Sequence, residues 1–369
     1  MNITNQEIIN RFESFIKSIS KNDKIAIIHD SDPDGICSAV IISKAIERIR
    51  SKKIDLRINQ SINEHGLNIK TVEILKKNNI NKVISTDLSL EEIPEMLKEL
   101  EKFADVLIID HHPILSTNYT QRVFIFKPQL FCEGIEPPKY CSSKLVYDMC
   151  SRVVDVSDLD WISAVGVIAD IATMAWPEFM TQVFKKYNIN KKKDWFNSKL
   201  GRIAEYIVST QSYDLSKIQE AFDTVYNAKS PDDIIKSGLK EYYKIVDAEI
   251  KDWVKNVNKR AEIYKDIDLI IYEIKSKYKI KSPISTIISF KYPNKTLITV
   301  DIDGDNVGVS ARRQDRKIKT NEMILYAIKG LKEAYGGGHP PASGARLKKE
   351  HYEIFKNKII EYLRDNKVQ

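Results

Sequence analysis

The chain has 369 residues, of which 43% are hydrophobic and 30% charged, and its formal net charge is +7 at pH 7. This composition is typical of globular proteins and allows two or three domains of ordinary size. It excludes an integral membrane protein, because every apolar run is far shorter than the ~20 residues that a spanning helix needs. Four cysteines without a CxxC pair indicate free thiols in a reducing cytoplasm rather than a disulfide scaffold.

The first ~180 residues alternate short β runs with helical stretches. Strands are predicted at 24–29, 55–59, 83–87, 106–110 and 123–126, with helices at 35–50, near 67–78 and near 91–102. Continuous β-branched strands separated by helices are typical of a mostly parallel sheet covered on both faces. We therefore predict an α/β domain over residues 1–185.

The middle of the chain is predicted to be mainly helical. Apolar residues recur every three or four positions from 232 to 264, as in a long helix with one apolar stripe. Such a helix would span roughly 45 Å, enough to connect two domains. We assign residues 186–265 to a helical connector.

The pattern returns to β after Asp266, and a helical stretch, a glycine-rich turn and a closing helix at 350–364 follow. This pattern predicts a smaller α/β domain over residues 266–369. Charge is divided unevenly along the chain: residues 1–180 hold 21 Lys/Arg against 26 Asp/Glu, whereas the remainder holds 37 against 25. An acidic half joined to a basic half suits a cation site facing a surface that attracts anions.

Acidic residues and histidines end three of the predicted parallel strands. They are His29, Asp30, Asp32 and Asp34 after the first strand, Asp87 after the third, and Asp110, His111 and His112 after the fourth. Ligands of open α/β sheets bind outside the carboxyl ends of the strands, so these side chains should converge. A single aspartate there more often caps the next helix. So many carboxylates at one edge are costly without a cation, and carboxylates with imidazoles favour Mn²⁺ or a similar divalent ion.

A second candidate site lies in the C-terminal region. Gly336, Gly337 and Gly338 let the backbone approach a phosphate, His339 can donate a hydrogen bond to it, and Arg312 can bind it bidentately. Taken alone, the segment would be a tight loop before two prolines. Beside a metal cluster we favour phosphate binding.

Three weaker candidates complete the set. His65 is interpreted either as a cleft residue or as part of a loop, and Ser142 and Ser143 are predicted to cap a helix. The alternating aspartates at 301–305 are interpreted as a hairpin turn rather than a metal site.

These motifs resemble those of the DHH phosphoesterase superfamily. HDSDPDG at 29–35, Asp87 and Asp110-His111-His112 are similar to its first three motifs, and Asp170 in AVGVIADIAT matches the fourth. SAR at 310–312 and YGGGHPPASGARL at 335–347 resemble the DHH-associated domain. Within the superfamily the chain is similar to archaeal-type RecJ-like proteins, and also to nanoRNases and cyclic-dinucleotide phosphodiesterases.

The resemblance implies a role for each matched residue. Asp87 would bridge two Mn²⁺ ions, with Mg²⁺ as the alternative ion. Asp32, with His29 or Asp30, would complete the ligands of one ion, and Asp34, His111 and Asp170 would hold the other. Asp110 and His112 would orient ligands or assist proton transfer. NanoRNase-like relatives place the histidine four residues before the first conserved aspartate, whereas His29 precedes Asp32 by three, which leaves open whether His29 or Asp30 is the ligand.

The resemblance also implies an activity. It is that of a two-metal hydrolase acting on single-stranded DNA or RNA or on short oligonucleotides, from the 5′ end and with release of nucleoside 5′-monophosphates. A small-molecule phosphoesterase acting on cyclic dinucleotides or 3′-phosphoadenosine 5′-phosphate is one alternative, and a replication-complex scaffold is another. The basic C-terminal half favours a polymer, and the presence of all four acidic motifs argues against a scaffold. Replication or repair proteins are further expected partners, and no binding to a membrane is expected.

Overall fold

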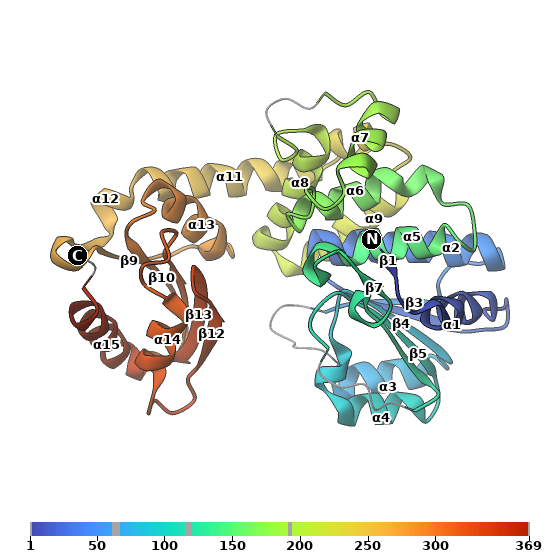
Figure 1. The fold of residues 1–369 in the computed structure, drawn as a ribbon, viewed down its shortest axis with the longest axis horizontal. Helices are drawn as coiled ribbons and strands as arrows, with labels where there is room; N and C mark the ends of the chain where they lie inside the picture. The colour runs from blue at the N-terminus through green and yellow to red at the C-terminus, as the bar shows by residue number, and fades with distance from the viewer. Residues whose placement is uncertain (1, 61–66, 115–119, 191–193, 368–369) are drawn as a thin grey trace. The chain divides into compact units, whose positions relative to one another are not determined.

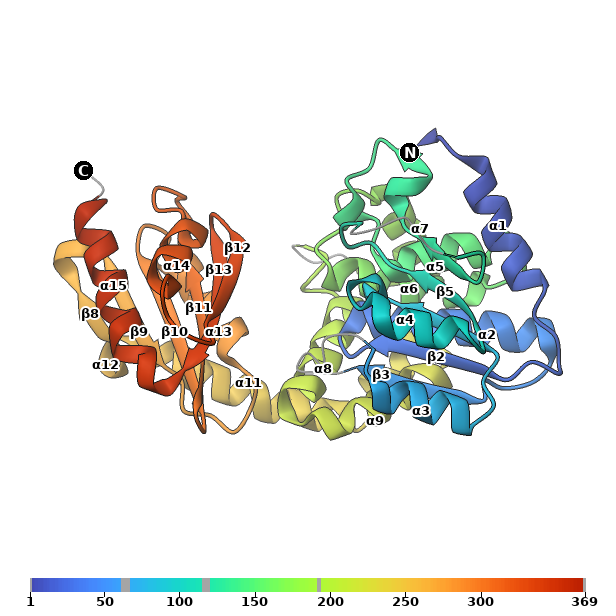
Figure 2. The ribbon, with the colours of Figure 1, turned by 90° about the horizontal axis from the view of Figure 1, so that it is seen from below.

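A computed structural model describes residues 2–60, 67–114, 120–190 and 194–367. The chain divides into two units, Met1–Tyr243 and Lys244–Gln369, each with its own sheet (Figures 1 and 2). The predicted α/β class is confirmed, with a parallel sheet in the first unit, a helical region, and a mixed sheet in the second. Within the described ranges, no helix combines the length and the apolar character needed to cross a membrane.

The first unit is built on a five-stranded parallel sheet with the order β3-β2-β4-β5-β6. Its strands are β2 (Ile25–Asp30), β3 (Leu56–Gln60), β4 (Lys82–Thr86), β5 (Asp105–Ile109) and β6 (Val123–Phe126). The buried strands are rich in Ile and Val, as expected of a sheet covered on both faces. A short pair, β1 (Asn2–Ile3) and β7 (Cys132–Glu133), lies outside this sheet.

Alternate strand residues supply the two cores of this unit. Ala26 and Ile28 pack toward α3 (Ile69–Lys77) and α4 (Pro94–Glu101), whereas Ile25 and Ile27 pack toward α1 (Gln6–Lys17) and α2 (Pro33–Arg50). This two-residue alternation is what places helices on both sides of the sheet.

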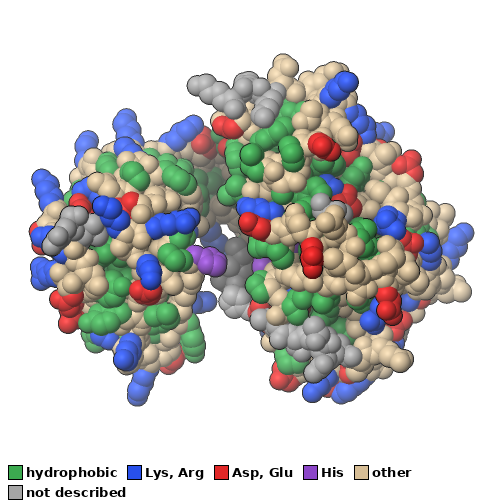
Figure 3. All heavy atoms as spheres, in the orientation of Figure 1, with side chains coloured by type: hydrophobic (Ala, Val, Ile, Leu, Met, Phe, Trp, Pro, Cys, Tyr) green, Lys and Arg blue, Asp and Glu red, His purple; other side chains and the backbone are tan. Residues whose placement is uncertain are grey.

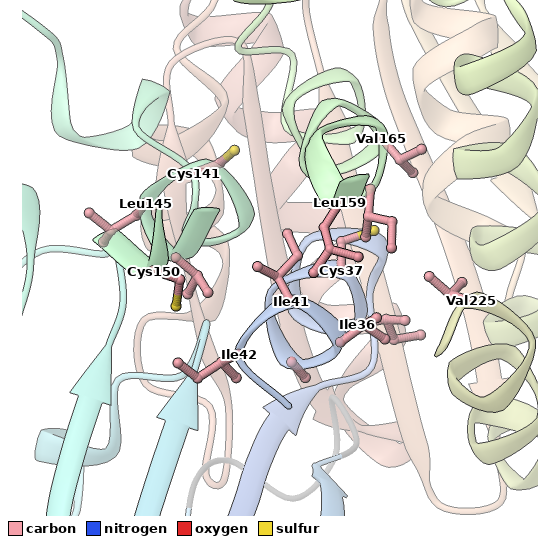
Figure 4. Close-up of a cluster of buried hydrophobic side chains, with 14 of the residues drawn as sticks. Ile36, Cys37, Ile41, Ile42, Cys141, Leu145, Cys150, Leu159, Val165 and Val225 are labelled. Carbon is pink, nitrogen blue, oxygen red and sulfur yellow. The ribbon is translucent and has the colours of Figure 1, made fainter. Parts of the chain in front are cut away.

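Helix α2 is the centre of the larger core (Figure 4). Around it pack α5 (Ser142–Cys150), α6 (Asp160–Ala169), α8 (Lys199–Tyr213) and α9 (Ile218–Asn227). Helix α7 (Pro177–Lys186) packs on α6, and α10 (Pro231–Ile235) packs on α8. Figure 4 shows Ile36, Ile41 and Ile42 of α2 facing apolar side chains of the neighbouring helices, with the buried thiols of Cys37, Cys141 and Cys150 among them. The four cysteines are free, as predicted.

The prediction of one long helix over 232–264 is wrong, because the segment forms three separate helices. Helix α10 ends at Ile235, α11 runs over Leu239–Lys255, and α12 is only Val257–Arg260. The breaks fall near Gly238 and at Asn256, whose side-chain amide donates to the Asp252 carbonyl in competition with the backbone. Helices α8, α9 and α10 belong to the first unit, and the boundary between units lies in α11. The division into functional ranges 1–185, 186–265 and 266–369 stays a prediction.

The second unit holds a six-stranded mixed sheet with the order β12-β13-β11-β10-β9-β8. The strands are β8 (Glu262–Tyr264), β9 (Leu269–Glu273), β10 (Thr296–Asp303), β11 (Asn306–Arg312), β12 (Tyr335–His339) and β13 (Ala342–Lys348). The core lies between the sheet and helices α14 (Thr320–Ile328) and α15 (Tyr352–Asp365), and α13 (Lys281–Lys291) also packs on β10 and β11.

Two local predictions for this unit have different outcomes. The hairpin turn is confirmed, because β10 and β11 pair from Asp303 and Asn306 outward and Gly304 has a φ of +56°. The glycine-rich turn is wrong: YGGGH is the edge strand β12, paired antiparallel with β13. Pairing with a partner strand outweighs the weak intrinsic strand preference of glycine.

A buried ion pair in the first unit makes stability depend on pH. The guanidinium of Arg50 is fully buried and donates to Asp55 Oδ2 at 3.1 Å. Burial of Asp55 opposes its ionisation, but hydrogen bonds from the Ile25 N–H, Lys52 and Arg50 outweigh it and lower the pKa of Asp55 to about 2. Because the folded-state pKa lies below the unfolded value, the resulting stability is present above about pH 4 and is lost as the pH falls toward 2.

We expect Asp55→Asn to lower the free energy of unfolding at pH 7 by about 2–3 kcal/mol and to flatten its decline between pH 4 and pH 2. Urea unfolding at pH 7 and pH 3 measures both effects. Asp158→Asn is the control, because Asp158 pairs with Arg48 at an exposed position and should cost less than about 1 kcal/mol. Equal acid slopes in Asp55→Asn and the parent would contradict the assignment.

Candidate metal centre

Three neighbouring parallel strands bring the acidic motifs together. Strands β2, β4 and β5 are adjacent in the sheet, and Asp30, Asp87 and Asp110 stand at or directly after their carboxyl ends. Asp87 has a φ of +62°, in the left-handed region that aspartate tolerates better than most residues. The convergence predicted from the sequence is therefore present in the fold.

The turn from β2 into α2 explains the spacing of the first motif. Asp32 is the N-cap of α2, and its carboxylate accepts from the Gly35 N–H at 2.8 Å. A Cβ on Gly35 would lie 2.6 Å from the Asp30 carbonyl oxygen, so this tight turn requires glycine. The turn directs three carboxylates, those of Asp30, Asp32 and Asp34, to one edge of the sheet.

Ligand atoms within 4.8 Å of one another form three groups. The first is Asp30, Asp32 and Asp87; the second is Asp34, His111 and Asp170; the third is Asp87, Asp110, His111 and His112. His111 Nε2 lies 3.3 Å from Asp87 Oδ1 and 3.4 Å from Asp170 Oδ2, so His111 links the groups. Asp170 reaches them from the C-terminal end of α6.

His29 lies outside these groups of described residues. Its ring stacks on Phe222 of α9 with the centroids 5.3 Å apart, and its Nδ1 lies 2.6 Å from the Asp30 carbonyl oxygen. Burial lowers the pKa of His29 to about 4. Of the two alternatives left open by the sequence, Asp30 has the ligand geometry.

The electrostatics of the cluster fit a divalent cation. Burial and the charge of Asp87 raise the pKa of Asp30 and of Asp34 to about 6, and burial with the charges of Asp34 and Asp87 raises that of Asp170 to about 8. Burial opposes protonation of His111, but Asp87, Asp34 and Asp170 outweigh it and raise its pKa to about 10. Five crowded carboxylates with one imidazole are a donor set for Mn²⁺ or Mg²⁺, whose charge would offset the repulsion.

A buried network holds Asp110 and His112. Lys127, fully buried after β6, lies 2.8 Å from Asp110 Oδ2 and also contacts the buried Glu91. Asp110 Oδ1 lies 2.7 Å from His112 Nδ1. Burial of Asp110 opposes its ionisation, but His112 and Lys127 outweigh it and lower the pKa of Asp110 well below its ordinary value.

Sequence reasoning missed Lys127 and Glu91. Lys127 interrupts the apolar run VFIF-K-P directly after a predicted strand, at the same edge as the acidic motifs, and that position was the available signal. Glu91 lies in the segment after Asp87, where nothing in the local pattern distinguishes it from a solvent-exposed glutamate.

The predicted capping role of Ser142 and Ser143 is wrong. Cys141 is the N-cap of α5, and the backbone N–H groups of Ser142 and Ser143 donate to the Asp34 carboxylate at 2.6 and 3.0 Å. Ser142 Oγ donates to Asp87 Oδ1 at 3.0 Å. The two serines therefore hold the carboxylates of candidate ligands instead of capping α5. His65, the other weaker candidate, lies outside the described residues.

The candidate phosphate residues lie together in the second unit. His339 pairs with Ala342 across β12 and β13, and Ala342 pairs with Arg312 across β13 and β11. Arg312 is half-buried, and its Nη1 donates to the carbonyls of Ala311 and Ser343 at 3.0 and 3.3 Å. His339 is exposed, as are Gly336, Gly337 and Gly338. His339 and Arg312 thus lie on one face of the C-terminal sheet, with the glycines next to His339 along β12.

Comparison with known proteins gives a consistent assignment for both units. Residues 24–176 match the DHH family, N-terminal domain, and residues 267–365 match the DHHA1 domain. An uncharacterized protein of Methanocaldococcus jannaschii is 23% identical over 92% of this chain and 93% of its own length. The single-stranded-DNA-specific exonuclease RecJ of Bacillus subtilis is 25% identical over 43% of this chain and 20% of its own length.

A solved structure of RecJ from Thermus thermophilus in complex with Mn²⁺ has the same fold. It aligns with a TM-score of 0.72 at 14% identity, over 97% of this chain and 55% of that chain. The matched regions therefore cover about half of that RecJ and a fifth of the Bacillus subtilis one.

Proposed function

Because the chain belongs to the DHH superfamily, with a DHH domain followed by a DHHA1 domain, we propose that it is a two-metal phosphodiester hydrolase. Its substrate is single-stranded nucleic acid or short oligonucleotides, cut from the 5′ end to nucleoside 5′-monophosphates. The observation that supports this most directly is that Asp87 and His111 each lie in two adjoining groups of candidate ligands.

The ligand groups suggest how two ions would be held. One ion would be bound by Asp30, Asp32 and Asp87, and the other by Asp34, His111 and Asp170. Asp87, whose Oδ1 lies 3.3 Å from His111 Nε2, would bridge the two ions. When bound, divalent ions acidify a water molecule and offset the charge that develops on the phosphate. Mn²⁺ is the proposed ion, with Mg²⁺ as the alternative.

Two further residues of the centre would handle protons. The Asp110 carboxylate fixes the orientation of the His112 ring through Nδ1. The His112 side chain is 52% exposed, and Nδ1 is the ring nitrogen that faces Asp110. We assign His112 to proton transfer with the leaving group and Asp110 to its positioning.

The second unit would bind the substrate phosphate through Arg312 and His339. Residues 244–369 hold 26 Lys/Arg against 17 Asp/Glu, and Figure 3 shows basic side chains spread over this unit. Such a surface increases the binding affinity of a nucleic-acid strand more than that of a small molecule, because each phosphate that it neutralises releases counterions.

Product analysis of the full chain tests the proposal. The substrates are end-labelled single-stranded DNA, an RNA dinucleotide and cyclic di-AMP, each with Mn²⁺ and with excess chelator. We expect Mn²⁺-dependent release of nucleoside 5′-monophosphates from the 5′ end of the strands. Faster cleavage of cyclic di-AMP would favour the small-molecule alternative, and no hydrolysis of any substrate would overturn the assignment.

A further inference from the structure

The three strands β11, β13 and β12 turn one face away from α14. Helix α13 packs on this outer face at β11, where Lys281 lies over Gly308. At β12, the same face carries the exposed candidate residue His339. On β11 and β13, Val307, Val309 and Leu347 point into the core with α14 and α15. Side chains alternate along a strand, so Arg346 and Gly344 lie on the outer face. A Cβ on Gly336 would meet Ile324 of α14 at 2.7 Å, which places Tyr335 and Gly337 on the outer face as well.

The strand register arranges the outer face in three rows. The first row is Tyr335, Arg346 and Gly308; the second is Gly337, Gly344 and Ser310; the third is His339, Ala342 and Arg312. Rows two residues apart are separated by roughly 7 Å along the strands. Tyr335 and Arg346 therefore lie roughly 13 Å from the candidate phosphate residues His339 and Arg312.

In the middle row, the two residues on β12 and β13 are glycines, so the surface between the first and third rows on these two strands is bare backbone, here called the floor. A Cβ on Gly337 would have no heavy atom within 4 Å, and one on Gly344 would meet only the Val309 carbonyl oxygen, at 3.1 Å. No side chain therefore rises from either glycine between the first and third rows. The floor leaves room for a sugar or a base lying along the strands.

The first row carries an exposed aromatic ring and an arginine, the side chains that commonly contact a base and a phosphate. Tyr335 is 71% exposed, an unusual position for an aromatic ring. Arg346 is exposed as well, and no ion pair to it occurs within the described part of the chain. The nearby Asp301 is paired with Lys281 above Gly308, so its charge is offset. An aromatic ring beside an unpaired arginine suits a base and its phosphate.

We propose that Tyr335 and Arg346 form a second nucleotide-binding position, which holds a nucleotide further along the single strand whose phosphate is bound by His339 and Arg312. Tyr335 stacks on the base and Arg346 binds the phosphate. One phosphate cannot reach both ends of a roughly 13 Å track, so the second position selects strands over mononucleotides. This inference rests on the proposed function and adds a length requirement to it.

Binding measurements on the full chain test the second position. Fluorescence anisotropy, with Ca²⁺ in place of Mn²⁺, measures the affinity for a 5′-phosphorylated ten-nucleotide thymidine strand, and competition measures that for thymidine 5′-monophosphate. Tyr335→Ala and Arg346→Ala should each weaken strand binding roughly ten-fold and leave mononucleotide binding unchanged. Arg346→Ala should also reduce the slope of log affinity against log salt by about one. Arg364→Ala, an exposed arginine on α15, is the matched control and should change neither.

A variant that fills the space above Gly337 tests whether a nucleotide lies there. Gly337→Leu places a side chain where the added Cβ meets nothing, so the unfolding temperature should not change while strand affinity falls. Strand affinities equal to the parent in all three variants would overturn the second position but leave Mn²⁺-dependent hydrolysis intact. An equal loss for strand and mononucleotide would also overturn it. If the unmodified chain binds neither ligand, the proposed function falls together with this inference.

Discussion

Replacing Asp87 by alanine should lower the turnover number by roughly 10³-fold or more. Asp87 belongs to the group with Asp30 and Asp32 and also contacts His111 of the second group, so its loss removes a candidate ligand from both ions. The fold should persist, because the Asp87 side chain accepts only the Ser142 hydroxyl and the His111 ring among the described contacts.

The stability of Asp87→Ala provides a second readout. Burial, and after it the charge of Asp87, raises the pKa values of Asp30, Asp32 and Asp34, so Asp87 repels these carboxylates in the metal-free site. Removing Asp87 should therefore raise the unfolding temperature of the metal-free protein, whereas added Mn²⁺ should stabilise the parent and not the variant. Metal content, thermal unfolding with and without Mn²⁺, and steady-state kinetics measure these effects.

Asp158→Asn is again a suitable control, since the exposed Asp158 side chain pairs with Arg48 and not with a candidate ligand. It should retain both turnover and stabilisation by Mn²⁺. Parent-like turnover in Asp87→Ala, with an unchanged manganese content, would refute the two-metal assignment.

The layout of the parallel sheet in the first unit could be predicted because its signals are local. Runs such as Ile25–Ile28 and Val106–Ile109 are apolar throughout, which is typical of strands covered on both faces. The carboxyl ends of adjacent parallel strands then bring Asp30, Asp87 and Asp110 to one edge, whatever the details of packing.

The choice between His29 and Asp30 could not be predicted in the same way. Both stand at the end of β2, and their side chains leave the strand in opposite directions. His29 faces Phe222, nearly two hundred residues later in the chain, and that contact removes its ring from the ligand groups. A local pattern contains no information about so distant a partner.

The strand β12 illustrates a second limit. Three consecutive glycines favour a turn by intrinsic preference, yet Gly336, Gly337 and Gly338 pair with residues 343–345 of β13. The absence of side chains is what allows Ile324 to pack closely over Gly336. The glycine pattern therefore predicts the wrong backbone structure for this segment, and its role as a phosphate site stays a prediction.

Lys127 shows how a structural contact extends the candidate site. Its ammonium group is fully buried between Asp110 and Glu91, and it lies within 3.4 Å of the Ser89 hydroxyl and 3.2 Å of the Pro113 carbonyl. Ser89 Oγ also donates to Asp110 Oδ2 at 2.8 Å. The position of Asp110, and through it the orientation of His112, thus depends on this lysine.

Lys127→Met should lower the free energy of unfolding by about 3–5 kcal/mol, because it leaves two buried carboxylates without their cation. Turnover should fall roughly ten- to a hundred-fold, since an Asp110 carboxyl that is no longer held in place cannot orient the His112 ring. Manganese content should not change, because Lys127 is not a ligand. Urea unfolding, metal analysis and kinetics of the same preparation measure the three effects.

Glu91→Gln separates the structural role of Lys127 from its positioning role. Combining it with Lys127→Met removes one of the two unpaired carboxylates, so the double variant should recover part of the lost stability. Turnover should stay low in the double variant, because the contact between Lys127 and Asp110 is still absent. Lys127→Arg, which keeps the charge, should retain more turnover than Lys127→Met. If turnover instead recovers in step with stability, Lys127 supports only the fold, and the orientation of His112 must come from Asp110 and Ser89 alone.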